Sequence, residues 1–205
     1  MMENYVCPGE LIFGADSHTC SYGALGAFGT GVGCTDLLYG MVTGKSWVLV
    51  PETVKFNLVG KLPEGVYARD LILTIIGTIG ANGCNYQVME FTGEGAKTLS
   101  ISERMVLCNM AVEAGAKTGI FEPDEKAIEY LEAHGRKPKA LFTSDPDAVY
   151  AREYTFDLSK IRPVVAKPDF VDNLVPAEEV RGVKIDEAFL GSCNNGRIED
   201  LRVGA

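Results

Sequence analysis

The sequence lacks several features that would point to particular classes of protein. Its 205 residues contain no basic run and carry a formal net charge of −9, so nucleic acid is not an expected partner. The N-terminus has no basic region followed by an apolar stretch, so a signal peptide is not expected. The most apolar segment, residues 71–79, is shorter than a membrane span and contains Thr74 and Gly77. These absences favour an acidic globular protein of the cytoplasm.

Six cysteines are present, but no two of them form a C-x-x-C pair. In a chain of this length, the simplest interpretation is reduced and mostly buried thiols. Glycine is dense between residues 23 and 33, which would allow a backbone or a ligand to approach closely. A dinucleotide-binding G-x-G-x-x-G motif would need glycine at position 34 or 36, where the sequence has Cys34 and Asp36. Dinucleotide binding is therefore not expected.

Apolar patterning predicts an α/β protein, because strands and helices alternate along the chain. Val54, Phe56 and Leu58 alternate with polar residues, as in a half-buried strand. Ser100 and Glu103 form a capping box at the start of a helix. The predicted strands are residues 11–13, 47–50, 54–58, 87–91, 117–121 and 183–190, and the predicted helices are residues 67–79, 100–114 and 122–135.

The order of these elements predicts three parts. We expect the C-terminal part of a first α/β domain in residues 1–51, a second α/β domain in residues 52–160, and the start of a third domain in residues 161–205. A proline-rich connector begins the third part, and a further helix begins just before the last residues. Both ends are therefore expected to be truncated, with the central part the most compact.

Asp16, Ser17 and His18 follow the first predicted strand. In α/β proteins, ligands bind beyond the carboxyl ends of strands, and a carboxylate beside an imidazole can fix its tautomer and raise its basicity. One interpretation is therefore that Asp16 and His18 contact each other. The alternative is a turn in which Asp16 caps backbone N–H groups and His18 is merely exposed.

Asn109 and Glu113 are four residues apart, which would place them on one face of a helix. The rest of this helix is apolar, and polar groups on a buried helix need partners. One interpretation directs both side chains toward the same cavity as Ser17. The other makes them the solvent face of the helix.

Cys193 lies in a predicted strand-to-helix turn, residues 191–196. Backbone N–H groups at such a turn point outward and favour a thiolate. One cysteine is not a metal site, because an iron–sulfur cluster needs three or four thiolates. No other cysteine here has ligand-like spacing to Cys193.

Three segments resemble motifs of the aconitase superfamily, in the family's order. Residues 14–26 contain Asp-Ser-His-Thr, and the following Cys-Ser-Tyr-Gly-Ala-Leu-Gly is similar to large subunits of 3-isopropylmalate dehydratase and homoaconitase. Residues 108–116 resemble the family's Cys-Asn-Met helix, and residues 189–201 resemble its first cluster-cysteine motif. The resemblance implies aconitase-like, three-layer α/β units.

The implied reaction is reversible dehydration and rehydration of a 2-hydroxy acid such as 2- or 3-isopropylmalate, a step of leucine biosynthesis. By resemblance, Asp16 and His18 help to deliver a proton to the leaving hydroxyl. Ser17 matches a residue that contacts a substrate carboxylate. Glu113 matches a carboxylate that hydrogen-bonds an iron-bound water or hydroxyl.

The implied cofactor is a [4Fe–4S] cluster acting as a Lewis acid. Cys193 matches the first of its three thiolates, and Asn109 matches a residue that lies against it. The family has threonine where this chain has Asn194, which puts in question only the hydrogen bonding around the thiolate.

The resemblance also implies groups that this sequence lacks. They are the other two cluster cysteines, upstream histidines, downstream substrate-binding arginines, and a proton-abstracting serine on a small swivelling subunit, the expected partner. The chain alone is therefore expected to hold no stable cluster and to be inactive. Alternative interpretations are a large subunit of homoaconitase or of another branched-malate dehydratase, and a non-catalytic α/β module that binds a partner.

Overall fold

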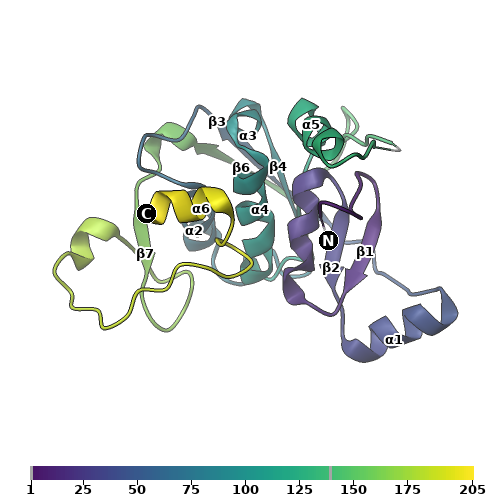
Figure 1. The fold of residues 1–205 in the computed structure, drawn as a ribbon, viewed down its shortest axis with the longest axis horizontal. Helices are drawn as coiled ribbons and strands as arrows, with labels where there is room; N and C mark the ends of the chain where they lie inside the picture. The colour runs from purple at the N-terminus through teal and green to yellow at the C-terminus, as the bar shows by residue number, and fades with distance from the viewer. Residues whose placement is uncertain (1, 139) are drawn as a thin grey trace.

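A computed structural model describes residues 2–138 and 140–205 (Figure 1). At its centre lies a four-stranded parallel sheet in the order β5–β4–β3–β6. The four strands are β3 (Thr53–Val59), β4 (Val88–Thr92), β5 (Thr118–Phe121) and β6 (Arg152–Asp157). Helices connect β3 to β4 and β4 to β5, so the predicted α/β class is confirmed. Three of the strands were predicted, and β6 was not.

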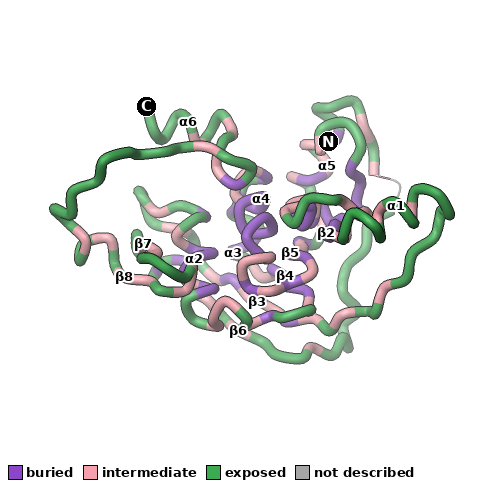
Figure 2. The backbone as a smooth tube through the Cα atoms, turned by 90° about the horizontal axis from the view of Figure 1, so that it is seen from below, coloured by how far each residue is buried: buried purple, intermediate pink, exposed green. Residues whose placement is uncertain are grey.

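The core is formed by this sheet and the helices that follow its strands. Val54, Phe56 and Leu58 of β3 are fully buried, and burying such side chains contributes about 1.5–3 kcal/mol each. They share one apolar cluster with α2 (Ala68–Ile79), α3 (Glu94–Thr98) and α4 (Ile101–Asn109). Figure 2 shows the buried backbone concentrated around α4 and β3 to β5.

The predicted capping box at the start of α4 is present. The Ser100 hydroxyl accepts a hydrogen bond from the Glu103 backbone N–H at 3.2 Å, and the Glu103 carboxylate accepts one from the Ser100 N–H at 2.7 Å. Two of the unpaired N–H groups at the helix start are thus satisfied. After Asn109 the chain tightens into the 3-10 helix η2 (Met110–Ala114).

The first part of the chain packs directly on the central unit. β1 (Leu11–Gly14) and β2 (Phe28–Gly31) pair in parallel and are joined by the 3-10 helix η1 (Ser17–Leu25), which packs against α4 and β5. A Cβ on Gly23 of η1 would lie 1.7 Å from the carbonyl oxygen of Gly119 in β5. Only glycine permits this approach, which brings the loop after β1 close to α4.

The remaining elements lie around this core. α5 (Glu125–Ala133) is the predicted helix after β5, and η3 (Leu158–Lys160) follows β6. The expected connector instead folds into an antiparallel pair, β7 (Val164–Ala166) and β8 (Leu174–Pro176). The 3-10 helix η4 (Ala177–Val180) and the terminal helix α6 (Ile198–Gly204) complete the chain, together with α1 (Cys34–Thr43), which extends away from the body (Figure 1).

Two predicted strands are wrong. Residues 47–50 are irregular, and Trp47 and Val50 are 81% and 85% exposed. Residues 183–190 are irregular and exposed throughout. A strand needs a neighbour to pair its N–H and C=O groups, and none of the strands in the described residues lies alongside either segment. The strand at residues 11–13 is present, but Leu11 is exposed and not buried as expected.

No helix among residues 2–138 and 140–205 is long and apolar enough to cross a membrane. The division of the chain at residues 51 and 160 stays a prediction, since the close packing of η1 on α4 is compatible with either one or two folding units.

Candidate functional site

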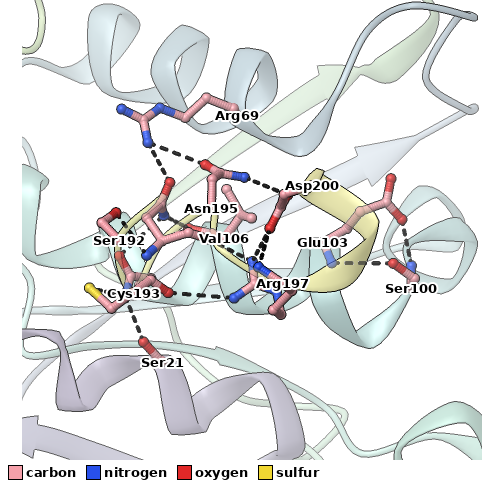
Figure 3. Close-up of polar contacts among 12 residues, drawn as sticks. Ser21, Arg69, Ser100, Glu103, Val106, Ser192, Cys193, Asn195, Arg197 and Asp200 are labelled. Atoms are coloured by element: carbon pink, nitrogen blue, oxygen red, sulfur yellow. Dashed lines mark hydrogen bonds and ion pairs between the residues drawn. The ribbon is translucent and has the colours of Figure 1, made fainter. Parts of the chain in front are cut away.

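Three segments that are far apart in the sequence meet at the C-terminal end of α4. The ring Nδ1 of His18 lies 3.0 Å from the carbonyl oxygen of Asn109. The side-chain Nδ2 of Asn109 lies 2.9 Å from the Ser21 hydroxyl and 3.5 Å from the sulfur of Cys193. Figure 3 shows Ser21 and Cys193 facing each other across this point, from η1 and from the turn before α6.

The imidazole of His18 is oriented by a main-chain carbonyl and not by Asp16. The Asp16 carboxylate accepts a hydrogen bond from the His18 backbone N–H at 2.8 Å and caps η1. The two residues are therefore in contact, but through the capping arrangement that was the alternative. Because a carbonyl only accepts, the Asn109 contact places the proton on Nδ1 and leaves Nε2 of the neutral ring with its lone pair.

Asn109 and Glu113 have different surroundings. Asn109 is fully buried, whereas Glu113 is half-buried, so the expectation of a solvent face is wrong for Asn109. The change from α4 to η2 between them also breaks the four-residue helical spacing. Glu113 lies near Arg69: desolvation lowers the pKa of Arg69, and the charges of Glu113 and Asp70 oppose this change.

Ser17 is exposed and lines a cavity of about 560 Å³ between the ends of β1 and β2 and the irregular segment around Trp47. Lys117 also lines this cavity. Neither Asn109 nor Glu113 does, so the expected cavity shared with Ser17 is not formed.

The cysteines near this site differ sharply. Cys193 is exposed in the turn before α6, next to Ser192, whose φ of +75° is left-handed. Cys20 and Cys108 are completely buried. Burial raises the pKa of Cys20 to about 12 and raises that of Cys108 well above its ordinary value. Both therefore remain neutral thiols at physiological pH, unlike a cluster ligand.

A complete cluster site does not fit the described part of the chain. Within it, no group of three or more histidine, cysteine or acidic side chains is placed to hold a metal ion. A [4Fe–4S] cluster needs several converging thiolates, and the site offers only Cys193. The residues present thus suit one ligand position and no more.

Two important members of the site were missed by the sequence reasoning. Arg69 donates hydrogen bonds to the side chains of Asn194 and Asn195, and Ser21 accepts one from Asn109. Ser21 lies inside a motif that was singled out. Arg69 carries no sequence signal, because it reads as an ordinary charged residue in the first turn of α2.

Comparison with known proteins gives the class to which this fold and site correspond. Residues 1–180 match the aconitase family (aconitate hydratase), and the chain belongs to this family.

Individual relatives are more specific. The chain is 54% identical over 200 residues to the 3-isopropylmalate dehydratase large subunit of Heliobacterium modesticaldum. The aligned region covers 98% of this chain and 48% of that protein. The chain is 53% identical over 203 residues to the 3-isopropylmalate dehydratase large subunit of Aquifex aeolicus, and the aligned region covers 99% of this chain and 47% of that protein. With large subunit 1 of Pyrococcus furiosus the identity is 54% over 202 residues, covering 98% and 48%. The chain thus spans about half the length of these relatives.

Proposed function

We propose that this chain is part of the large subunit of a hydro-lyase that reversibly dehydrates a 2-hydroxy acid such as 2- or 3-isopropylmalate. The observation that carries the proposal is the meeting of His18, Asn109 and Cys193 at one point. These residues come from three separate motifs, and the names of the similar proteins support this activity. A small subunit is the partner, and the setting is leucine biosynthesis in the cytoplasm. The six free thiols agree with that compartment.

His18 is the residue best placed to move a proton. Its Nδ1 is held by the Asn109 carbonyl, so Nε2 remains free to accept a proton and then to deliver it to a leaving hydroxyl. Asp16 acts on His18 through the backbone, by fixing the start of η1. The exposed hydroxyl of Ser17 can bind a substrate carboxylate, and Glu113 can accept a hydrogen bond from a hydroxyl.

In the proposed full enzyme, a [4Fe–4S] cluster would supply Lewis-acid polarisation of the C–O bond. Cys193 would be one ligand, with the Asn109 carboxamide beside it. The other thiolates would come from the part of the enzyme that this chain does not cover. This chain's own contribution is therefore to provide one thiolate, to orient His18 and to bind substrate.

A chimera tests this proposal. The matching segment of the Heliobacterium modesticaldum large subunit is replaced by this chain, and the chimera is purified anaerobically with the small subunit of that organism. We expect it to contain iron and to form the alkene product, measured by ultraviolet absorbance. His18→Ala should lower kcat by about 100-fold or more, and Cys193→Ser should lower the iron content.

Cys34→Ser is the matched control, because Cys34 is an exposed thiol on α1 and should leave both readouts unchanged. A folded chimera that holds iron and has no turnover would contradict the proposed activity. Normal iron content in the Cys193→Ser chimera would contradict the proposed ligand.

A further inference from the structure

The last 25 residues bury one side chain against the body of the protein. Among residues 181–205, only Asn194 is buried, at 6% exposure. The preceding segment is irregular and exposed, and α6 buries no side chain. A buried polar group is costly unless it is hydrogen-bonded, so the partners of Asn194 determine whether the turn that carries Cys193 stays in place.

Every polar atom of the Asn194 side chain has partners. Its Oδ1 accepts a hydrogen bond from Nη1 of Arg69. Its Nδ2 donates to the Val106 carbonyl oxygen at 3.3 Å and to Oδ1 of Asn109 at 3.1 Å. In addition, Arg197 Nη2 donates to the Asn194 backbone carbonyl at 2.6 Å. Figure 3 shows Arg69 reaching from α2 toward this turn and Val106 of α4 behind it.

These partners fix the direction of each hydrogen bond. A guanidinium group only donates and a backbone carbonyl only accepts, so Asn194 must turn its oxygen to Arg69 and its NH2 group to Val106. That NH2 group also requires the oxygen of Asn109. The NH2 group of Asn109 then faces the Ser21 hydroxyl, 2.9 Å away, and the sulfur of Cys193, 3.5 Å away.

We propose that Arg69 and Asn194 are positioning residues, which lock the Cys193 turn onto the end of α4 and hold the Asn109 NH2 group toward the Cys193 sulfur. The role of Cys193 as a cluster ligand rests on the proposed function. The hydrogen bonds by which Arg69 and Asn194 hold this turn against α4 do not depend on it. A threonine hydroxyl at position 194 would have a single proton, so it could donate to the oxygen of Val106 or to that of Asn109 but not to both.

Asn194→Asp tests this series of hydrogen bonds, from Arg69 through Asn194 and Asn109 to the Cys193 sulfur. Aspartate keeps the size of asparagine but cannot donate a hydrogen bond. The 22.1 kDa chain is suited to NMR of asparagine side-chain NH2 groups labelled with ¹⁵N. We expect the Asn109 NH2 signal to shift toward that of free asparagine. Backbone hydrogen exchange in residues 192–201 should become about tenfold faster or more. Exchange in β3 reports whether the chain stays folded.

Arg69→Met should shift the Asn109 NH2 signal in the same way. Arg69→Lys should shift it less, because lysine keeps a donor for the Asn194 oxygen. Asn195→Asp is the control of matched charge: Asn195 contacts Arg69 and Asp200 but does not reach Asn109, so its Asn109 signal should stay unchanged. The proposal would be overturned by an unchanged Asn109 signal in Asn194→Asp, or by an equal shift of that signal in Asn195→Asp. Neither readout involves iron or turnover, so a failure here is distinct from a failure of the proposed function.

Discussion

The buried thiols of this protein differ in chemistry from its exposed ones. Cys20, Cys84 and Cys108 are fully buried. Burial raises the pKa of Cys84 to about 11 and that of Cys20 to about 12. Because the thiolate is the reactive form, these side chains are protected both by low access and by their protonation state, whereas Cys34 and Cys193 are exposed.

This difference predicts the pattern of alkylation. With iodoacetamide at pH 8, Cys34 and Cys193 should react, while Cys20 and Cys108 should react slower by on the order of 100-fold or more. Mass spectrometry of peptides measures each rate, and the same reaction in denaturant is the control. Labelling of native Cys20 as fast as Cys34 would show that η1 does not pack on α4 as described.

A second residue-scale feature is the ion pair that joins α4 to the start of α5. Arg104, which is 1% exposed, donates to both carboxylate oxygens of Asp124, one of them at 2.8 Å. Burial alone would raise the pKa of Asp124, but hydrogen bonding and the charge of Arg104, with the Ala127 N–H, outweigh it and lower the pKa. The charged form of Asp124 is therefore favoured in the folded state.

Asp124→Asn should lower the free energy of unfolding at pH 7 by roughly 2 kcal/mol, since asparagine still caps α5 but leaves Arg104 without its counter-charge. A lowered folded-state pKa gives stability that is present above the unfolded pKa and is lost as pH falls through the folded pKa. The difference between wild type and variant should therefore shrink below about pH 4. Urea unfolding at several pH values measures it.

Asp145→Asn, in an exposed loop, is the control and should change stability by less than about 0.5 kcal/mol. A difference between wild type and Asp124→Asn that stays constant from pH 7 to pH 3 would contradict the linkage argument.

Part of the site could be predicted from single residues and part could not. The motifs pointed to His18, Asn109 and Cys193, and the structure brings these three together. The partner of the imidazole could not be read from the sequence, because it is a main-chain carbonyl of a residue 91 positions away. Arg69 was missed for the same reason: a long-range contact of a surface-type residue leaves no local pattern.

At the scale of elements, the sequence predicts helices and strands best where apolar periodicity coincides with a local signal such as a capping residue or a glycine stop. β3 has strict alternation, α4 has a capping box, and α2 ends at glycine, and all three were found. Residues 47–50 are apolar, and residues 183–190 mix apolar side chains with Lys184, Asp186 and Glu187. Neither segment has a strand beside it in the described residues. β6 was missed because its edge position leaves every residue exposed or half-exposed, so the apolar signal is weak.

Hydrogen exchange distinguishes these elements. We expect the slowest exchange in β3, β4, α2 and α4, which share the core, and fast exchange in α1, which buries no side chain. The reason is that opening a core element exposes far more apolar surface than opening α1. Strongest protection at residues 11–13 or 185–190 would contradict the view that residues 52–160 are the most stable part.

At the scale of the whole molecule, the chain has a well-packed centre and a lightly attached C-terminal segment. The C-terminal segment lies over α4 and is exposed along most of its length (Figures 1 and 2). The chain covers about half of each relative, and the proposed function assigns to it one face of an active site: His18, Asn109 and one thiol.

Anaerobic reconstitution of the chain with iron and sulfide tests that claim most directly. The measurement is the number of irons retained per chain after desalting, with the absorbance assay for alkene formation alongside. A single accessible thiolate at the site predicts no stoichiometric four-iron cluster and no turnover, with Cys193→Ser removing whatever iron is weakly held there. Four irons per chain with measurable turnover would contradict the account, because Cys34 is the one other exposed cysteine and at least one thiolate would then have to come from a cysteine that the structure buries.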